Sequence, residues 1–143
     1  MADEDPITNL FPEAQAAVER RLLEIMDAAR TKDVHRLESY HLYGPKFTKF
    51  DDFEPLERQD AEETRRLERE AITGVKAFVP RVEQLKVDVF GPAAVATFVF
   101  DYAVTLPDDE QLAVRARSTL VFAQDGAEWK IVHEHFSPFK SNP

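Results

Sequence analysis

The chain has 143 residues, of which 43% are hydrophobic and 31% charged, and these proportions suit one globular domain with its own core. Its formal net charge of −9 excludes a nucleic-acid-binding surface of clustered Lys and Arg, and the lack of cysteine in the sequence excludes disulfides and thiolate chemistry. Because the N-terminus has no basic-then-apolar segment and no apolar run could span a membrane, we expect a soluble, cytoplasmic protein that binds neither nucleic acid nor membrane.

The first half of the chain has helical periodicity after a flexible acidic tail over residues 1–11. The first helix begins at Pro12, and its apolar residues recur every three or four positions. Asp33 is placed to cap a second, short helix, which Gly44-Pro45 stops. The second helix carries Val34, Leu37 and His41.

A short strand over residues 46–50 and an acidic loop lead to a third helix. This helix begins near Asp60 and ends at Pro80. Its predicted buried stripe is Leu67, Ala71, Val75 and Phe78. Its other face is charged, and we expect it to be solvated.

Beyond Pro80 the hydrophobic period changes from 3.6 to 2, which is typical of strands. Four strands over about 82–90, 93–106, 111–124 and 128–137 are separated by short turn signals. Three helices and a short strand followed by an antiparallel meander predict a single α+β domain over 12–138, with 139–143 as a second tail.

Alternation sorts the strand residues into two faces, one of them rich in large apolar side chains. That apolar area is too large to leave in water, so we expect a homodimer through this outer face. The residues assigned to it are Phe98, Phe100, Leu120, Phe122, His133 and His135. A β-bulge would reverse these assignments locally.

The segment from Thr119 to Ser137, with Asp125-Gly126 and the run Trp-Lys-Ile-Val-His-Glu-His-Phe-Ser, resembles a known signature. It is similar to the C-terminal strands of SnoaL-like proteins of the nuclear transport factor 2-like superfamily, and to the calcium/calmodulin-dependent kinase association domain. The resemblance extends from about residue 12 to 138. It implies three N-terminal helices packed in the concave face of a strongly curved, mostly antiparallel sheet, the cystatin-like cone, with an internal pocket.

The resemblance also implies which positions face that pocket. The pocket arginines of the association domain fall at Val99, Thr119 and Phe136, so an anion held in that manner is not expected. The base of ketosteroid isomerase falls at or beside Asp51. Ile25 and Thr119 stand where that enzyme has its other two polar groups, so its mechanism is not supported.

Glu134 and Arg117 are the polar pair expected inside the cone. A carboxyl lined by Val99 and Phe136 would be desolvated, which raises its pKa toward that of a useful acid or base. Three interpretations stay open: catalysis by Glu134 or Asp51 with Arg117 fixing charge, anchoring of a ligand, and a structural ion pair. Asp51 is also compatible with a solvated turn.

Aromatic residues around Tyr40 and Tyr43 are placed at the mouth of such a cone, where they suit either packing or a hydrophobic ligand. The predicted ligand-binding residues are Tyr40, Tyr43, Phe50, Val99, Asp101, Thr119 and Phe136. His133 and His135 have the spacing of a metal pair, but we prefer structural histidines at the dimer interface and predict no metal or other cofactor.

These features predict a homodimeric cone protein that binds a small, largely apolar organic molecule. Cofactor-independent isomerase or dehydratase chemistry by side-chain acids and bases is the enzymatic form of this prediction. The alternative is a non-catalytic dimerisation or interaction module whose cone is filled by side chains. The sequence leaves open whether the protein is an enzyme.

Overall fold

The computed structural model describes residues 5–140. Three helices precede most of the sheet: α1 (Pro12–Arg30), α2 (Val34–Ser39) and α3 (Ala61–Thr73). Asp33 caps α2 by accepting a hydrogen bond from the Arg36 amide, and Asp60 caps α3 in the same way through Glu63. The predicted tails fall partly on residues 1–4 and 141–143, which lie outside the described part of the chain.

Five strands form one sheet in the order β1-β5-β4-β3-β2. Their bounds are β1 (Thr48–Phe50), β2 (Ala77–Val89), β3 (Ala93–Thr105), β4 (Gln111–Asp125) and β5 (Glu128–Pro138). Strands β2 to β5 form an antiparallel meander, and β1 joins the edge of β5 in parallel. The predicted short strand is thereby confirmed.

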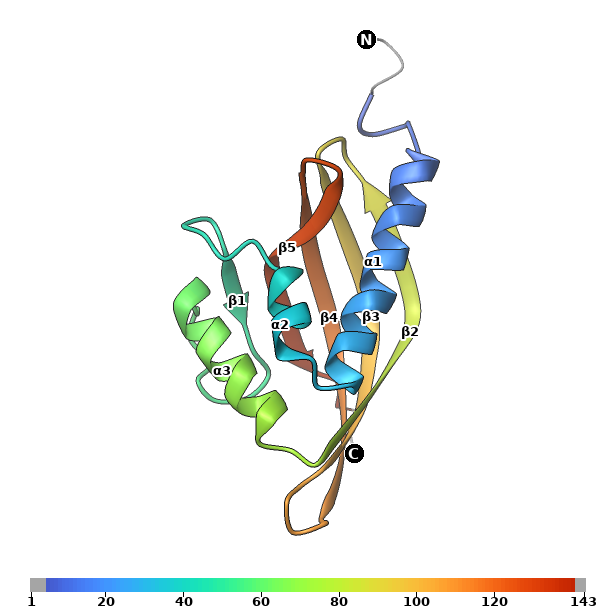
Figure 1. The fold of residues 1–143 in the computed structure, drawn as a ribbon. Helices are drawn as coiled ribbons and strands as arrows, with labels where there is room; N and C mark the ends of the chain where they lie inside the picture. The colour runs from blue at the N-terminus through green and yellow to red at the C-terminus, as the bar shows by residue number, and fades with distance from the viewer. Residues whose placement is uncertain (1–4, 141–143) are drawn as a thin grey trace.

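All three helices lie on one face of the twisted sheet, as Figure 1 shows. The apolar stripe of α1 is buried as predicted, at Val18, Leu22, Ile25 and Ala29. It forms one core with the large side chains of β3 and β4. The α+β cone architecture is therefore confirmed. Among residues 5–140, no helix is long and apolar enough to cross a membrane.

The predicted end of the third helix is wrong. The helix α3 stops at Thr73, where Gly74 follows, and Phe78 and Pro80 belong to β2. Proline is tolerated there because β2 is an edge strand and needs no hydrogen bond from every backbone nitrogen. The buried residues of α3 are Thr64 and Ile72 rather than Leu67 and Ala71.

The predicted faces of β3 and β4 are reversed. Phe98, Phe100, Leu120 and Phe122 are buried in the core beneath the helices, so they cannot form an outer dimer interface. Packing against α1 removes this apolar face from water. From the sequence, a second subunit was expected to cover it. The opposite, outer face carries Val99, Asp101, Arg117 and Thr119.

A bulge in β5 explains why the predicted faces were right for residues 133–136 of that strand. Val121 pairs with His133 and Phe122 with Ile131, so Val132 is left between them and the alternation shifts by one residue. Glu134 therefore lies opposite Leu120 on the inner face, while His133 and His135 lie on the outer face as expected. Homodimerisation itself stays a prediction, without the four apolar residues assigned to it.

Candidate functional site

Five ionisable side chains converge on the inner side of the sheet, between β1, β5 and α3. We call them the ion cluster: His41, Lys49, Asp51, Glu68 and Glu134. His41, Lys49 and Glu134 are each at least nine-tenths buried. Removing so many charges from water is energetically expensive unless they pair with one another.

Backbone pairing places Lys49 and His41 in the cluster, and helical spacing places Glu68. Lys49 lies directly opposite Glu134 in the parallel β1–β5 pair. His41 follows α2 and bridges to Ile131 of β5, where the Ile131 amide donates to the Tyr40 carbonyl at 2.8 Å. Glu68 follows buried Thr64 by four residues and precedes Ile72 by four, so the inner face of α3 carries it.

His41 is held by hydrogen bonds at both ring nitrogens. Its Nδ1 donates to the Leu37 carbonyl at 2.8 Å, and its Nε2 lies 3.0 Å from Glu134 Oε1 and 3.7 Å from Glu68 Oε2. Burial alone lowers the pKa of His41, but the two glutamates outweigh it and raise that pKa to about 9. Both nitrogens therefore act as donors, and His41 is an imidazolium at neutral pH.

Lys49 is the second buried cation. Its Nζ lies 3.4 Å from Asp51 Oδ2 and 3.6 Å from Glu134 Oε2. Burial alone would lower the pKa of Lys49, but Glu68, Glu134 and Asp51 outweigh it and raise that pKa well above its usual value. The amine therefore stays protonated and is unsuited to act as a nucleophile.

The two glutamates of the cluster have opposite pKa shifts. Burial and the neighbouring Glu134 raise the pKa of Glu68 from 4.5 to about 7. Burial also disfavours the Glu134 carboxylate, but Lys49 and His41 outweigh it and lower the Glu134 pKa to about 2. Glu134 is therefore a permanent anion, whereas Glu68 gains and loses its proton near neutrality.

An aromatic surface adjoins the ion cluster on the same side of the sheet. We call it the aromatic wall: Phe78, Phe100, Tyr102 and Phe136. Its ring centroids lie 5.0 to 6.4 Å apart. Lys49 Nζ lies 5.2 Å from the centroid of the Phe136 ring. Burial and nearby Asp52 and Asp51 raise the pKa of the Tyr102 hydroxyl, so that hydroxyl is a proton donor beside two acids.

Several buried polar atoms near this site have no hydrogen-bond partner among residues 5–140. They are Gln59 Nε2, Glu68 Oε2, Ser118 Oγ and Glu134 Oε2. Gln59 bridges to Lys49, and Ser118 lies opposite Phe136, so these atoms surround the cluster and the wall. Buried polar groups are normally paired, which makes these the groups that a bound polar molecule would satisfy.

His41, Glu68 and Glu134 could also hold a metal ion, because their ligand atoms all lie within 4.8 Å of one another. Lys49, however, already places an ammonium 3.6 Å from Glu134 and would repel a divalent ion. His133 and His135 lie on the outer face, where His133 Nδ1 is 2.9 Å from Thr48 Oγ1. The donor set therefore fits protons better than a metal.

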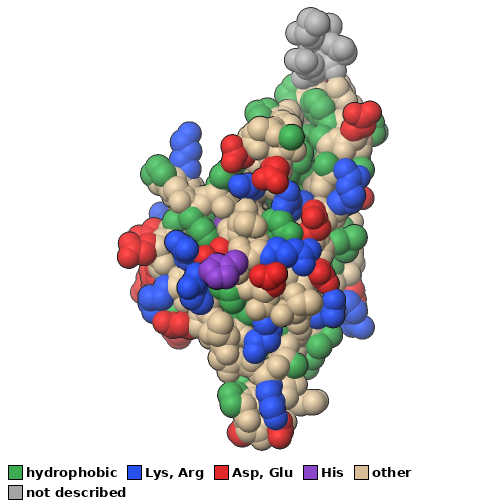
Figure 2. All heavy atoms as spheres, in the orientation of Figure 1, with side chains coloured by type: hydrophobic (Ala, Val, Ile, Leu, Met, Phe, Trp, Pro, Cys, Tyr) green, Lys and Arg blue, Asp and Glu red, His purple; other side chains and the backbone are tan. Residues whose placement is uncertain are grey.

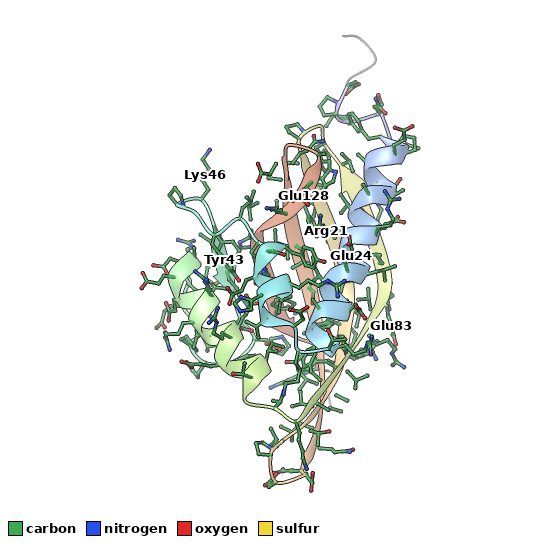
Figure 3. All side chains as sticks on the ribbon, in the orientation of Figure 1. Arg21, Glu24, Tyr43, Lys46, Glu83 and Glu128 are labelled. Carbon is green, nitrogen blue, oxygen red and sulfur yellow. The ribbon has the colours of Figure 1, made fainter. Side chains whose placement is uncertain are left out.

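The structure brings together some of the predicted site residues and separates others. Glu134, Asp51 and Phe136 belong to the cluster or the wall, and Tyr43 stacks on His41 at 4.8 Å. Figure 3 labels Tyr43 between α2 and α3. Tyr40 has a packing role instead: its hydroxyl accepts from Arg36 Nε at 2.8 Å, and Arg21 covers its ring.

The other predicted site residues lie on the wrong face for an internal pocket. Arg117, Val99, Asp101 and Thr119 lie on the outer face, and Phe50 contacts His135 and Arg58 there. The predicted Glu134–Arg117 ion pair is therefore wrong, because the sheet separates the two side chains. Lys49 and His41 are the partners of Glu134.

Sequence reasoning missed the roles of Glu68, Lys49 and His41. The spacing of Thr64, Glu68 and Ile72 marks one face of α3, but the many charges around Glu68 hide that face. Lys49 alternates with Thr48 and Phe50 in a strand too short to show which side is buried.

A family model described as the SnoaL-like domain matches residues 18–141. The chain belongs to the SnoaL-like family. Three solved structures that are named as nuclear transport factor 2-like proteins show the same fold. The comparison with curated proteins gives no match.

The first of these structures is a superfamily protein from Salmonella enterica serovar Typhimurium LT2, with a TM-score of 0.80 and 14% identity over 92% of this chain and 95% of that chain. A Streptomyces avermitilis protein, provisionally named a dehydratase, has a TM-score of 0.81 and 16% identity over 91% and 99%. A protein of unknown function from Pseudomonas putida KT2440 has a TM-score of 0.77 and 20% identity over 93% and 92%.

Proposed function

We propose that this SnoaL-like protein binds a small, largely apolar organic molecule against the aromatic wall and transfers protons on it through the ion cluster. The observation that carries the proposal is the burial of the cluster directly beside the wall, with Lys49 contacting both. Clusters of buried ionisable groups with shifted pKa values are typical of functional sites. The Glu68, Glu134 and Ser118 oxygens that accept no hydrogen bond among residues 5–140 would bind the polar groups of that molecule.

The pKa values assign different roles to the two glutamates. Glu68 is the proposed proton carrier, because a pKa of about 7 lets it both donate and accept a proton at neutral pH. Glu134, which the sequence favoured as the acid or base, would hold His41 and Lys49 in place as an anion. Asp51 and Lys49 would bind the polar end of the ligand beside Phe136.

The reaction supported by this arrangement is a proton shift or an elimination on a neutral molecule. Neither step requires a cofactor, because a carboxyl group near neutrality supplies and removes the proton. The dehydratase name given to one structural neighbour is compatible with this class. A homodimer is part of the proposal, as the sequence predicted, but its interface is left open.

The test uses 2-tetralone, a neutral bicyclic aromatic ketone, as the probe. We expect its addition to shift the amide NMR signals of Phe136 and Tyr102, and the protein to accelerate exchange of its α-protons with deuterated water. Glu68→Gln should slow that exchange about 100-fold, the usual contribution of one general acid or base, while binding persists. Glu70→Gln, an exposed neighbour on α3, should behave as wild type.

The proposal would be wrong if the probe shifts no signal on the inner face, or if Glu68→Gln exchanges protons as fast as the wild type. Binding without any exchange would support the alternative, a non-catalytic interaction module. That alternative has one observation in its favour: Phe47 and Phe122 are almost completely buried and fill part of the cone.

A further inference from the structure

We infer that a hollow on the outer face of the sheet binds small organic anions, carboxylates or phosphates. The hollow has a volume of about 450 Å³. Its floor and rim include Thr97, Val99, Arg117, Thr119, His135 and Phe139. It lies on the side of the sheet turned away from the helices, which is the far side in Figure 1. The inference is independent of the proposed inner site.

The hollow is lined by basic and neutral groups although the chain carries a net charge of −9. Neither Asp nor Glu is among its lining residues in the described part of the chain. A second, adjoining hollow adds Lys140 to Arg117 and Phe139. The local field therefore favours an anion, against the sign of the rest of the molecule.

Arg117 has no ion pair or hydrogen bond among residues 5–140, because the carboxylates near it on the outer face already have partners. Asp101 Oδ2 lies 3.2 Å from Arg81, and Asp101 Oδ1 lies 3.4 Å from Arg115. Glu83 lies 2.8 Å from Arg81 and 3.5 Å from Arg115. Two arginines, Arg81 and Arg115, thus form ion pairs with the two carboxylates. The Arg117 guanidinium stays available to a ligand.

The other groups in the hollow define the ligand class. A guanidinium offers two parallel N–H donors that match a carboxylate or a phosphate. The hydroxyls of Thr97 and Thr119 and the imidazole of His135 can donate further hydrogen bonds. Val99 is buried in the floor and Phe139 is 41% exposed at the rim, so an apolar or aromatic stem would gain contact.

The C-terminal segment builds one side of this hollow. The Phe139 amide donates to the Arg115 carbonyl at 3.1 Å, and the Arg115 guanidinium lies 4.5 Å from the centre of the Phe139 ring. This stacking fixes Phe139 beside the first half of β4 and engages Arg115, which again leaves Arg117 as the cation available to an anion.

The test is calorimetric titration at low salt with four probes: benzoate, phenyl phosphate, inorganic phosphate and neutral benzyl alcohol. We expect saturable binding of benzoate or phenyl phosphate but not of benzyl alcohol, and the two anions distinguish a carboxylate from a phosphate site. Arg117→Gln should weaken binding about ten- to 100-fold, the range for a hydrogen bond to a charged group. Arg20→Gln removes the same charge from an exposed position on α1, where Arg20 has no ion pair or hydrogen bond among residues 5–140, and should leave binding unchanged.

The inference is overturned if no anion binds saturably, or if Arg117→Gln and Arg20→Gln weaken binding equally. The competing explanation is that Arg117 contacts a second copy of the chain, and sedimentation of the same variants tests it. If Arg117→Gln dissociates a dimer and no anion binds the wild type, Arg117 pairs with a second copy of the chain, and the hollow is not a ligand site.

Discussion

Glu68 and Glu134 are chemically identical side chains, but the ion cluster shifts their pKa values in opposite directions. Glu134 lies beside His41 and Lys49, so its negative charge is stabilised although it is buried. Glu68 is buried beside that anion, so its own charge is opposed. Pairs of acids whose surroundings separate their pKa values are the usual basis of acid–base assignments in enzymes.

Replacing Glu68 should stabilise the protein in mild alkali. Its pKa of about 7 in the folded state exceeds the usual 4.5, so the stability that its proton contributes is complete below pH 4.5 and lost as the pH rises through 7. We expect Glu68→Gln to raise the free energy of unfolding at pH 8 by about 1–3 kcal/mol. Urea unfolding measures this, with Glu70→Gln as the control; a less stable Glu68→Gln at pH 8 would contradict it.

Replacing Glu134 should have the opposite effect. Glu134→Gln would leave the His41 and Lys49 cations buried beside a neutral amide. We expect the free energy of unfolding at pH 7 to fall by about 3–5 kcal/mol, as for other broken buried pairs. Glu128→Gln, an exposed change at the start of β5, should cost less than about 1 kcal/mol. Equal losses in the two variants would show that Glu134 is not the anion of the cluster.

The helix α3 carries Glu68 into the cluster, and its first turn depends on Asp60. The Glu63 amide donates to Asp60 Oδ1 at 2.9 Å. Removing this cap with Asp60→Ala should cost about 1 kcal/mol, and Asp60→Asn, which keeps an acceptor oxygen, should recover most of it. Thermal unfolding of the two variants makes the comparison, and no difference between them would exclude a capping role.

The elements differ in how far the sequence determines them. The helix α1 is long and strictly periodic, so its start and its buried stripe were predicted correctly. The end of α3 was not, because Val75 and Phe78 continue the apolar spacing after Gly74 has ended the helix. The faces of β3 and β4 depend on which side the helices cover, and no local pattern contains that information.

The residues of the candidate site were likewise only partly predictable from the sequence. Glu134 and Phe136 could be placed on the inner face from the resemblance of the last strand. His41, Lys49 and Glu68 come from a loop, a three-residue strand and a helix, and only tertiary packing brings them together. Acidic and basic side chains are also intermingled on the surface over the helices, as Figure 2 shows. A charged residue in the sequence therefore does not by itself reveal a buried charge.

For the complete domain, the cluster predicts an asymmetric dependence of stability on pH. The His41 pKa of about 9 exceeds the usual 6.5, so its contribution is present below pH 6.5 and lost as the pH rises through 9. The Glu134 pKa of about 2 lies below 4.5, so its contribution is present above pH 4.5 and lost as the pH falls through 2.

The Glu68 contribution is lost between pH 4.5 and 7, so the three shifts together place maximum stability near pH 4.5, with a decline from there to pH 9. Urea unfolding across this range measures the decline, and Glu68→Gln should reduce the part of it that lies between pH 4.5 and 7. A free energy of unfolding that stays constant from pH 6.5 to 9 would exclude the buried imidazolium.

Carbon-13 NMR titration of the glutamate side-chain carboxyls observes the ion cluster itself. The structure predicts one carboxyl with a midpoint near pH 7 that Glu68→Gln removes, and one that stays ionised to near pH 2 and disappears in Glu134→Gln. If every glutamate titrates between about pH 4 and 5, as exposed carboxyls do, the cluster is not a coupled proton-transfer site.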